Sequence, residues 1–247
     1  MCGRFVAASS PALLADRFAV DEVDASVGPE PEPDYNVSPR RGVLVVRERE
    51  GERVLSRLRW GLVPSWAKDP SVGDRMINAR AETVADKPAY RRAFAGKRCI
   101  IPADGFYEWK RGSAAGGVKP PKQPFFIHRR DGEPLAFAGL WEVWKVPPDA
   151  DPALGGPDGW LRSCTIVTGP ANELLAPIHD RMPIVLPASA WDQWLDPDEH
   201  DTAALGRMLV PAPAEWFEAY AVSTRVNNAR NNGAALVERL EDAPRHD

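Results

Sequence analysis

Apolar runs of strand length recur along most of this chain and predict a protein built largely of β-structure. Several runs alternate between apolar and polar residues and others are continuously apolar, which is typical of strands covered on one or both faces. The predicted strands are residues 43–47, 54–60, 98–101, 106–110, 124–129, 135–144, 163–168, 183–186 and 217–223.

Helical spacing appears only in short stretches between these runs. Ser9, Ser10 and Pro11 precede Leu14 and Phe18, so we expect a first helix with a serine cap and a proline at its start. Apolar residues on one face predict further helices at 83–96, 170–178, 191–195 and 234–240.

The remaining segments read as connections within one domain. Four prolines and three acidic residues between 27 and 39 predict an extended surface strap, and residues 112–121 and 146–159 predict Gly/Pro-rich mobile loops. We therefore expect a single α+β domain over residues 1–240, made of mostly antiparallel strands in a barrel-like sheet with flanking short helices. Residues 241–247 are expected to form a disordered tail.

Composition places the chain among ordinary water-soluble proteins. Of its 247 residues, 44% are hydrophobic and 27% are charged, which suits a packed core. No apolar run approaches the ~18 residues of a membrane span, and no export signal is evident, so we expect a cytoplasmic protein without a membrane partner. Three cysteines without CxxC spacing and four scattered histidines predict reduced thiols, no bound metal and no cofactor.

Charge is unevenly distributed along the chain. The formal net charge is −4, but residues 36–145 hold 22 Lys and Arg against 12 Asp and Glu, a net of +10, and the remainder carries −14. The middle of the chain can therefore present a basic face to phosphates, because binding follows local potential. The alternative is a solvated strand surface with scattered arginines.

Cys2 carries the most distinctive chemistry in the sequence. If Met1 is removed, Cys2 offers a free α-amine and a thiol on adjacent carbons. The amine can condense with an aldehyde to an imine, and the thiol can then close a five-membered ring on the imine carbon. The alternative is an ordinary residue in a frayed terminus.

Three further polar residues stand in apolar or strand-like surroundings. Glu108 lies between Tyr107 and Trp109, so either its pKa is raised for proton transfer or an arginine neutralises it. His179 is either catalytic or the cap of the preceding helix, and Asn78 either a satisfied core amide or a donor to a ligand oxygen.

Arginines and tryptophans accompany these residues. The arginines suit bidentate contacts to phosphate, and they are Arg4, Arg40, Arg59, Arg75 and Arg80. Trp60, inside a strand run, is expected in the core. Trp66, in a loop, is better suited to stacking on bases of single-stranded nucleic acid.

Taken together, these segments resemble the SOS-response-associated peptidase (SRAP) family over almost the whole chain. The matching segments are Met1-Cys2-Gly3-Arg4-Phe5, Tyr35-Asn36-Val37-Ser38-Pro39, Arg59-Trp60-Gly61-Leu62-Val63-Pro64-Ser65-Trp66, Ile77-Asn78-Ala79-Arg80-Ala81-Glu82-Thr83, Gly105-Phe106-Tyr107-Glu108-Trp109, Ile178-His179-Asp180-Arg181-Met182-Pro183, and Val226-Asn227 with Asn231 and Gly233. The loop between Trp66 and Asn78 departs from a basic groove because it carries Asp69 and Asp74.

The resemblance implies a protein of the DNA-damage and SOS response that senses abasic sites in single-stranded DNA. It implies a covalent DNA–protein crosslink, a thiazolidine, formed through Cys2 after removal of Met1. The implied catalytic residues are Cys2, Asn78, Glu108 and His179. The implied DNA-binding residues are Arg4, Pro39, Arg40, Trp66 and Arg80.

The same resemblance carries further expectations and two alternatives. We expect a monomer that associates with the nucleoid when bound to DNA, with replication-fork proteins as partners and a lyase activity through the imine. One alternative is a thiol peptidase or autopeptidase using Cys2, Glu108 and His179. The other is a non-covalent reader of single-stranded or modified DNA, which gives Cys2 no role.

Overall fold

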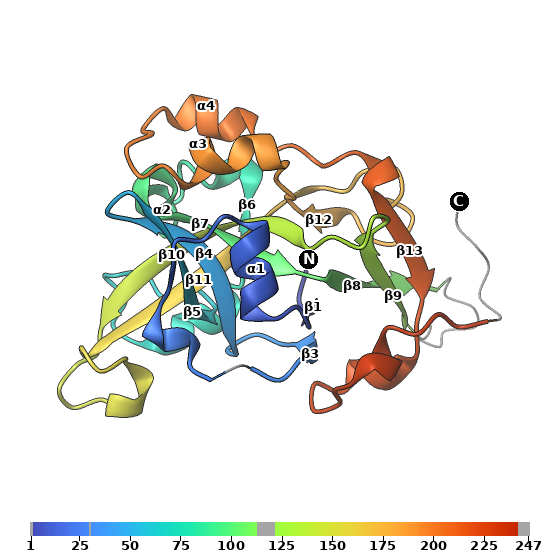
Figure 1. Ribbon diagram of the computed structural model, residues 1–247, viewed down its shortest axis with the longest axis horizontal. Helices are drawn as coiled ribbons and strands as arrows, with labels where there is room; N and C mark the ends of the chain where they lie inside the picture. The colour runs from blue at the N-terminus through green and yellow to red at the C-terminus, as the bar shows by residue number, and fades with distance from the viewer. Residues whose placement is uncertain (1, 30, 113–121, 242–247) are drawn as a thin grey trace.

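Two β-sheets account for most of the computed structural model, and they meet near the start of the chain (Figure 1). The structure describes residues 2–29, 31–112 and 122–241. Most of the predicted loop at 112–121 and of the predicted tail at 241–247 therefore lies outside the described residues.

The larger sheet closes on itself. Its strands follow the order β12 (Arg181–Pro183), β11 (Trp160–Pro170), β10 (Leu135–Lys145), β7 (Arg98–Ala103), β4 (Gly42–Arg49), β5 (Glu52–Trp60) and β2 (Glu22–Val23). The end of β5 also pairs in parallel with β11, with Trp60 opposite Cys164. Strands β4, β5, β7, β10 and β11 therefore form a five-stranded barrel, and β6 (Asn78–Arg80) adds to the outer part of β11.

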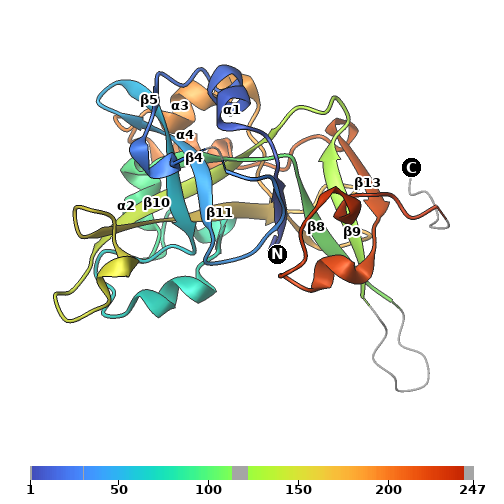
Figure 2. The same cartoon turned by 60° about the horizontal axis from the view of Figure 1, so that its bottom comes forward.

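The smaller sheet lies at one end of this barrel. Its order is β13 (Phe217–Ala221), β9 (Lys122–Arg129), β8 (Gly105–Arg111), β1 (Phe5–Ala7) and β3 (Asp34–Val37), all antiparallel. Figures 1 and 2 show β8, β9 and β13 on one side of the molecule, with the connection between β10 and β11 on the other.

One hydrophobic cluster fills the barrel and continues into the smaller sheet. Each barrel strand contributes buried residues, among them Val45, Leu58, Cys99, Phe137 and Cys164. The ring of Phe5 on β1 packs edge-on against Trp60, with centroids 5.1 Å apart. Burial of this apolar surface holds the start of the chain against the barrel end.

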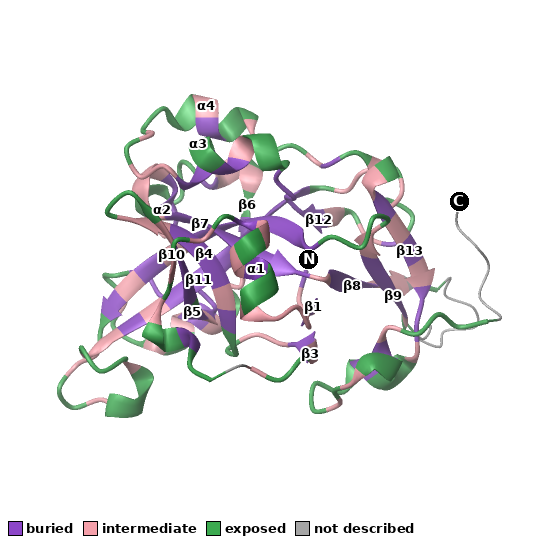
Figure 3. Cartoon of the chain, in the orientation of Figure 1, coloured by how far each residue is buried: buried purple, intermediate pink, exposed green. Residues whose placement is uncertain are grey.

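Short helices cover the outside. Helix α1 (Pro11–Arg17) begins at Ser10, whose side chain accepts a hydrogen bond from the Leu13 N–H. The others are α2 (Arg91–Gly96), α3 (Trp191–Leu195) and α4 (Thr202–Arg207). Figure 3 shows exposed residues on the helices and buried ones along the barrel strands. No helix in the described ranges has the length and apolar composition needed to cross a bilayer.

Brief 3-10 turns link the strands. They are η1 (Ala25–Val27), η2 (Pro70–Arg75), η3 (Ala81–Thr83), η4 (Pro152–Leu154), η5 (Ala188–Ala190), η6 (Ala214–Trp216), η7 (Thr224–Asn227) and η8 (Ala234–Leu236).

The predicted α+β class, the antiparallel strands, the barrel and the capped first helix are confirmed. The helix predicted at 83–96 is wrong over its first half, because Pro88 prevents a continuous helix and only α2 forms. Residues 170–178 form turns instead of a helix, with Pro177 removing a backbone donor. The last predicted helix reduces to η8, and Leu240 then donates to the backbone of Ala221.

Two predicted extended segments also differ in detail. The strand predicted at 183–186 lies earlier, as β12, and beyond it only an isolated bridge joins Val185 to Phe137. The strap at 27–39 is not wholly at the surface, because β3 pairs with β1 and buries Asn36 and Val37.

Candidate active site

Cys2 lies at the junction between the barrel and the smaller sheet. It is fully buried in the same cluster as Phe5 and Trp60. Its Sγ lies 3.8 Å from the carbonyl oxygen of Arg4. Burial raises the pKa of the Cys2 thiol, and the negative charge of Glu108 acts in the same direction. The sulfur is therefore a thiol at neutral pH, in a site that disfavours the thiolate.

Asn78 fixes the backbone of Cys2. Strand β6 holds Asn78 beside Ile166 of β11, and the Asn78 Nδ2 donates a 2.8 Å hydrogen bond to the Cys2 carbonyl. Because that partner can only accept, the amide nitrogen must face Cys2. The Asn78 Oδ1 is buried and has no hydrogen-bond partner among the described residues. An acceptor is thus left for a donor that enters the site.

Tyr90 supports Asn78 from the opposite direction. Its hydroxyl donates a 3.1 Å hydrogen bond to the Asn78 carbonyl. Burial raises the pKa of Tyr90 to about 12, so the hydroxyl remains a donor at any physiological pH. Sequence reasoning missed this role, because an aromatic residue within the helix expected at 83–96 is typical of a core position.

Glu108 projects from β8, the strand that pairs with β1. Only 2% of the residue is exposed. Burial raises the pKa of its carboxyl to about 7, against an opposing hydrogen bond from the Trp109 backbone. Both protonation states are therefore populated near neutrality, which is the condition for a group that accepts and returns a proton. The raised pKa agrees with the aromatic neighbours in the sequence.

His179 completes the group from the turn that follows Pro177. Its Nε2 lies 4.0 Å from the Oε2 of Glu108. Its Nδ1 accepts a 3.0 Å hydrogen bond from the Arg181 backbone N–H and lies 3.0 Å from the carboxylate of Asp180. The backbone N–H can only donate and the carboxylate can only accept, so these two contacts favour opposite protonation states of Nδ1. No α-helix precedes His179, so the helix-cap interpretation is wrong.

The four predicted catalytic residues are therefore brought together from distant parts of the chain. Asn78 bonds to Cys2, the charge of Glu108 acts on the Cys2 thiol, and Glu108 faces His179. The pairings of β1 with β8, of β6 with β11 and of β12 with β11 bring their segments together. The described residues contain no group of three or more His, Cys, Asp or Glu side chains placed to hold a metal ion.

Arg4 is engaged inside the protein. Its Nη1 donates to the Oδ1 of Asn36 at 2.7 Å and to the carbonyl of Val226 at 2.9 Å. Burial lowers the pKa of this guanidinium. The predicted phosphate contact therefore has to come from the nitrogens that these two bonds leave available.

Arg40 and Arg59 share one carboxylate. Arg40 is exposed, has a positive φ of 75° and lies 2.5 Å from Asp74, while Arg59 lies 2.7 Å from the other oxygen of Asp74. Asp74 therefore reduces the positive charge of this loop, in line with the acidic departure seen in the sequence. Arg75 and Arg80 are exposed, and Arg80 ends the short strand that carries Asn78.

The two tryptophans differ in exposure, and the predicted core position of Trp60 is confirmed. Trp60 is fully buried, and its Nε1 donates to the Ile77 carbonyl at 2.9 Å. Trp66 is 60% exposed and presents a large apolar ring to solvent. Pro39 is half-buried beside Arg40.

Asn36 has a structural role that the sequence did not reveal. Its side-chain amide, 3% exposed, donates to the carbonyls of Val226, Asn228 and Asn231 while its oxygen accepts from Arg4. This one side chain holds the segment around η7 against β3. In the sequence, Asn36 stands between Tyr35 and Val37, and a polar residue between an aromatic and an aliphatic neighbour is the pattern that indicates a buried amide.

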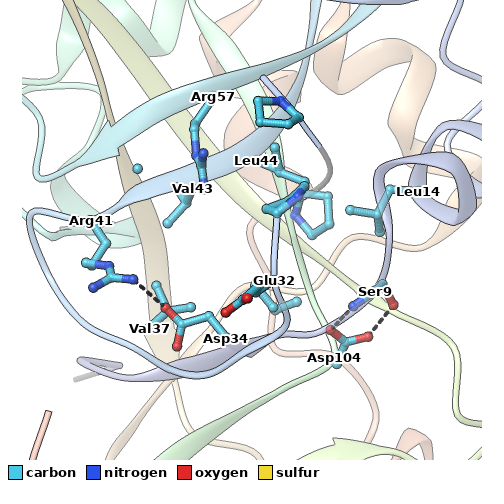
Figure 4. Close-up of a pocket in the computed structure, with 16 residues that line it drawn as sticks. Ser9, Leu14, Glu32, Asp34, Val37, Arg41, Val43, Leu44, Arg57 and Asp104 are labelled. Carbon is cyan, nitrogen blue, oxygen red and sulfur yellow. Dashed lines mark hydrogen bonds and ion pairs between the residues drawn. The ribbon is translucent and has the colours of Figure 1, made fainter. Parts of the chain in front are cut away.

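A separate cavity of about 350 Å³ lies between α1, the strap and β4 (Figure 4). Asp104 accepts hydrogen bonds there from the Ala8 and Ser9 backbone and from the Ser9 hydroxyl. Arg41 lies 3.3 Å from Asp34. None of the four residues around Cys2 lines this cavity, and these charged groups already have partners within it.

The family model for SOS response associated peptidase matches residues 1–229. The abasic site processing protein YoqW of Bacillus subtilis is 42% identical over 241 residues, covering 96% of this chain and 99% of that protein. The abasic site processing protein YedK of Escherichia coli is 35% identical over 247 residues, with 96% and 99% covered. HMCES of Xenopus tropicalis, also an abasic site processing protein, is 34% identical over 231 residues, covering 81% of this chain and 64% of its own length.

Solved structures agree with the fold. A protein from Bacteroides thetaiotaomicron superposes with a TM-score of 0.81 at 23% identity, covering 97% of this chain and all of its own. A phage-related protein from Bordetella bronchiseptica gives 0.64 at 29% identity, covering 90% and 95%. With the family model spanning nearly the whole chain and relatives above 40% identity, the chain belongs to the SOS response associated peptidase (SRAP) family.

Proposed function

We propose that this protein reacts covalently with abasic sites in single-stranded DNA through Cys2, after removal of Met1. The observation that carries the proposal is the placement of Cys2: Asn78 holds its carbonyl, and Glu108 and His179 face each other beside it. Relatives named abasic site processing protein match almost the full chain. An abasic deoxyribose opens to an aldehyde, which is the electrophile that an aminothiol traps.

The first step uses the α-amine of Cys2. An α-amine has a reference pKa of about 7.7–8.0, so part of it is neutral at pH 7. Its lone pair attacks the aldehyde carbon and gives a carbinolamine, which loses water to form an imine. The burial-raised pKa of the thiol favours this order, because the sulfur is not a ready nucleophile at the start.

The second step closes the ring. The Cys2 sulfur adds to the imine carbon, a C–S bond forms, and the thiol proton is transferred to the nitrogen. The product is a thiazolidine that joins protein and DNA, with water as the only molecule lost. Because sulfur and nitrogen belong to one residue, no entropy is lost in bringing a second nucleophile to the carbon.

Glu108 is suited to move the protons of both steps. With a pKa of about 7 it can protonate the departing hydroxyl and then accept the thiol proton. His179, whose Nε2 lies 4.0 Å from the Oε2 of Glu108, would donate to the sugar oxygen freed by ring opening. The Oδ1 of Asn78 would accept from the α-amine or a sugar hydroxyl.

DNA would contact the exposed residues that the family resemblance assigns to binding. Trp66 offers a flat ring for stacking of a base, and Arg80 and Arg40 offer charge to the backbone. Pro39 would pack beside a flanking base, and Arg4 would combine its structural bonds with a phosphate contact.

The test is intact mass of the protein incubated with a single-stranded oligonucleotide bearing one abasic site, without a reducing agent. We expect a protein-plus-DNA species that Cys2→Ala lacks. Cys2→Ser keeps an amine but cannot form the C–S bond, so it should give adduct only after borohydride. Cys164→Ala, a second buried thiol, is the matched control and should crosslink normally. A wild-type protein that binds the oligonucleotide but gains no mass would favour a non-covalent reader.

A further inference from the structure

The barrel has a second mouth, at the end away from Cys2. A cavity of about 850 Å³ opens there between β4, β5, β10, β11 and residues 156–158. Figure 1 shows the β10–β11 connection at this end, across the molecule from β8, β9 and β13. The charged and aromatic residues that line it are Asp24, Arg47, Arg49, Arg57, Arg59, Trp141, Asp158, Trp160 and Arg162.

Arg47 forms the floor of this mouth. It follows Val43 and Val45 on the same face of β4, and both valines belong to the cluster inside the barrel. Arg47 is 5% exposed. Its Nε donates to the Ser56 hydroxyl at 3.2 Å, and its guanidinium carbon lies 4.9 Å from the centroid of the Trp141 ring. These contacts fix the plane of the guanidinium.

Arg47 lines the cavity, and its guanidinium has two terminal nitrogens besides the bonded Nε. No carboxylate of the described residues lies within 4.0 Å of them, and none of the described groups accepts a hydrogen bond from them. Neither terminal nitrogen of Arg47 is completely shielded from solvent. Burial lowers the pKa of Arg47, and the charge of Arg49 acts in the same direction. The positive charge is thus held in a poorly solvated place without a counter-charge in contact, which is costly unless an anion binds.

The carboxylates at the rim of the cavity already form ion pairs with rim arginines. Arg49 pairs with Glu22 and Asp24, and Arg162 pairs with Asp158 at 2.6 Å. Five arginines and two aspartates line the cavity, so its lining carries a surplus of positive charge. Arg59 also pairs with Asp74, but no carboxylate of the described residues lies within 4.0 Å of Arg57, so Arg47 and Arg57 carry the charge left for an anion.

We propose that this mouth binds the phosphate group of a nucleotide, free or within a strand. The fixed fork of a guanidinium matches two phosphate oxygens, and the mouths of β-barrels are common ligand sites. Trp141 and Trp160 supply flat apolar walls beside the charge. The site is distinct from that of Cys2, because Leu58, Cys99 and Cys164 fill the barrel between them.

The test measures binding of inorganic phosphate, thymidine monophosphate and thymidine by calorimetry at constant ionic strength. We expect both phosphates to bind and thymidine not to bind. Arg47→Gln should weaken phosphate binding at least tenfold, the effect of losing one charge-assisted pair. Arg92→Gln removes the same charge from an exposed position of α2 and should bind as the wild type does.

A second measurement avoids dependence on the folding of the variant. In the wild type, phosphate should shift the Nε–Hε NMR resonance of Arg47 more than that of any other arginine. An unbranched oligothymidylate without an abasic site distinguishes the sources: Arg47-dependent binding points to a strand, and binding of the monophosphate alone points to a free nucleotide. No phosphate binding in the wild type, or equal binding by Arg47→Gln, would overturn the proposal.

Failure here can be separated from failure of the proposed crosslinking. Cys2→Ala should keep phosphate binding at the mouth, and Arg47→Gln should crosslink to an abasic oligonucleotide within twofold of the wild-type rate. If the loss of either residue abolishes both activities, the two sites are not independent and the proposal of a separate site is wrong.

Discussion

At the scale of single residues, burial determines the chemistry around Cys2. The thiol of Cys2 and the carboxyl of Glu108 are both shielded from water, and both have raised pKa values. A neutral thiol beside a carboxyl that titrates near pH 7 is a poor arrangement for thiolate attack and a good one for proton transfer. This contrast favours the α-amine of Cys2 as the first nucleophile and weakens the peptidase alternative.

The raised pKa of Glu108 predicts a pH dependence of stability. A carboxyl whose pKa rises from 4.5 to about 7 on folding binds more protons in the native state between these values, so stability falls as pH rises through that window. By pH 8 the loss reaches about 3 kcal/mol. Urea unfolding of the wild type and Glu108→Gln at pH 5 and pH 8 should show the wild type losing more stability by roughly this amount. An equal loss in both proteins would contradict the assignment.

Asn78 predicts a separation of binding from reaction. Asn78→Ala removes the bond to the Cys2 carbonyl, so the α-amine loses its orientation and crosslinking should slow at least tenfold. Affinity for an oligonucleotide without an abasic site should change less than threefold, measured by fluorescence anisotropy. A parallel loss of affinity and rate would assign Asn78 to DNA binding alone. The matched control is Gln193→Ala, which removes an exposed amide from α3, outside the site.

At the scale of elements, the strands were largely predictable and the site geometry was not. Alternation and apolar runs located β4, β5, β7, β8, β9 and β10 within a few residues, because covered strands carry that pattern. Strands β1, β3 and β6 escaped, since runs of three or four residues give too little pattern. Those short strands hold the segments of Cys2, Asn36 and Asn78. The motif of each residue was visible in sequence, but the pairings that bring them together are long-range.

Helices were the least predictable elements. Pro88 and Pro177 interrupt two segments whose apolar spacing favours a helix. The spacing of apolar residues alone does not show where a proline ends a helix. The hydrogen-bond partners of Arg4 could not be predicted either, because they lie more than thirty and more than two hundred residues away along the sequence. Its internal bonds with Asn36 and Val226 appear only once β1 and β3 are paired.

Gly61 predicts a local weak point between β5 and η2. Its φ is 123°, and a Cβ there would lie 2.6 Å from the Gly73 carbonyl oxygen. Gly61→Ala should therefore lower the free energy of unfolding by more than about 2 kcal/mol, measured by urea denaturation. Gly206, in α4, has nothing within 4 Å of such a Cβ, so Gly206→Ala should be neutral or stabilising by about 0.5–1 kcal/mol. Equal effects at the two positions would contradict this reading of the turn.

At the scale of the whole molecule, one barrel separates two ends of different character. The end that meets the smaller sheet holds Cys2 and its polar neighbours, and the other end is lined by arginines around Arg47. Packed side chains fill the barrel between them, so the two ends are expected to act independently. Exposed Trp66 belongs to neither the barrel core nor this far mouth, which leaves it available for DNA.

Trp66 predicts the contribution of stacking to DNA affinity. Trp66→Ala should weaken binding of a single-stranded oligonucleotide by about 1–3 kcal/mol, and Trp66→Phe should restore most of it, because a smaller ring still stacks. Fluorescence anisotropy at several salt concentrations checks both variants. The slope of affinity against salt should stay unchanged, since the indole carries no charge. A changed slope with intact affinity would argue against a stacking role.

The most direct test of the central claim is the intact mass of the wild type and of Cys2→Ala after incubation with an abasic oligonucleotide. The account predicts a wild-type chain that lacks Met1 and gains the mass of the oligonucleotide less one water, and a Cys2→Ala chain that gains nothing stable without borohydride. A wild-type chain of unchanged mass, or an equally stable adduct on Cys2→Ala, would contradict it.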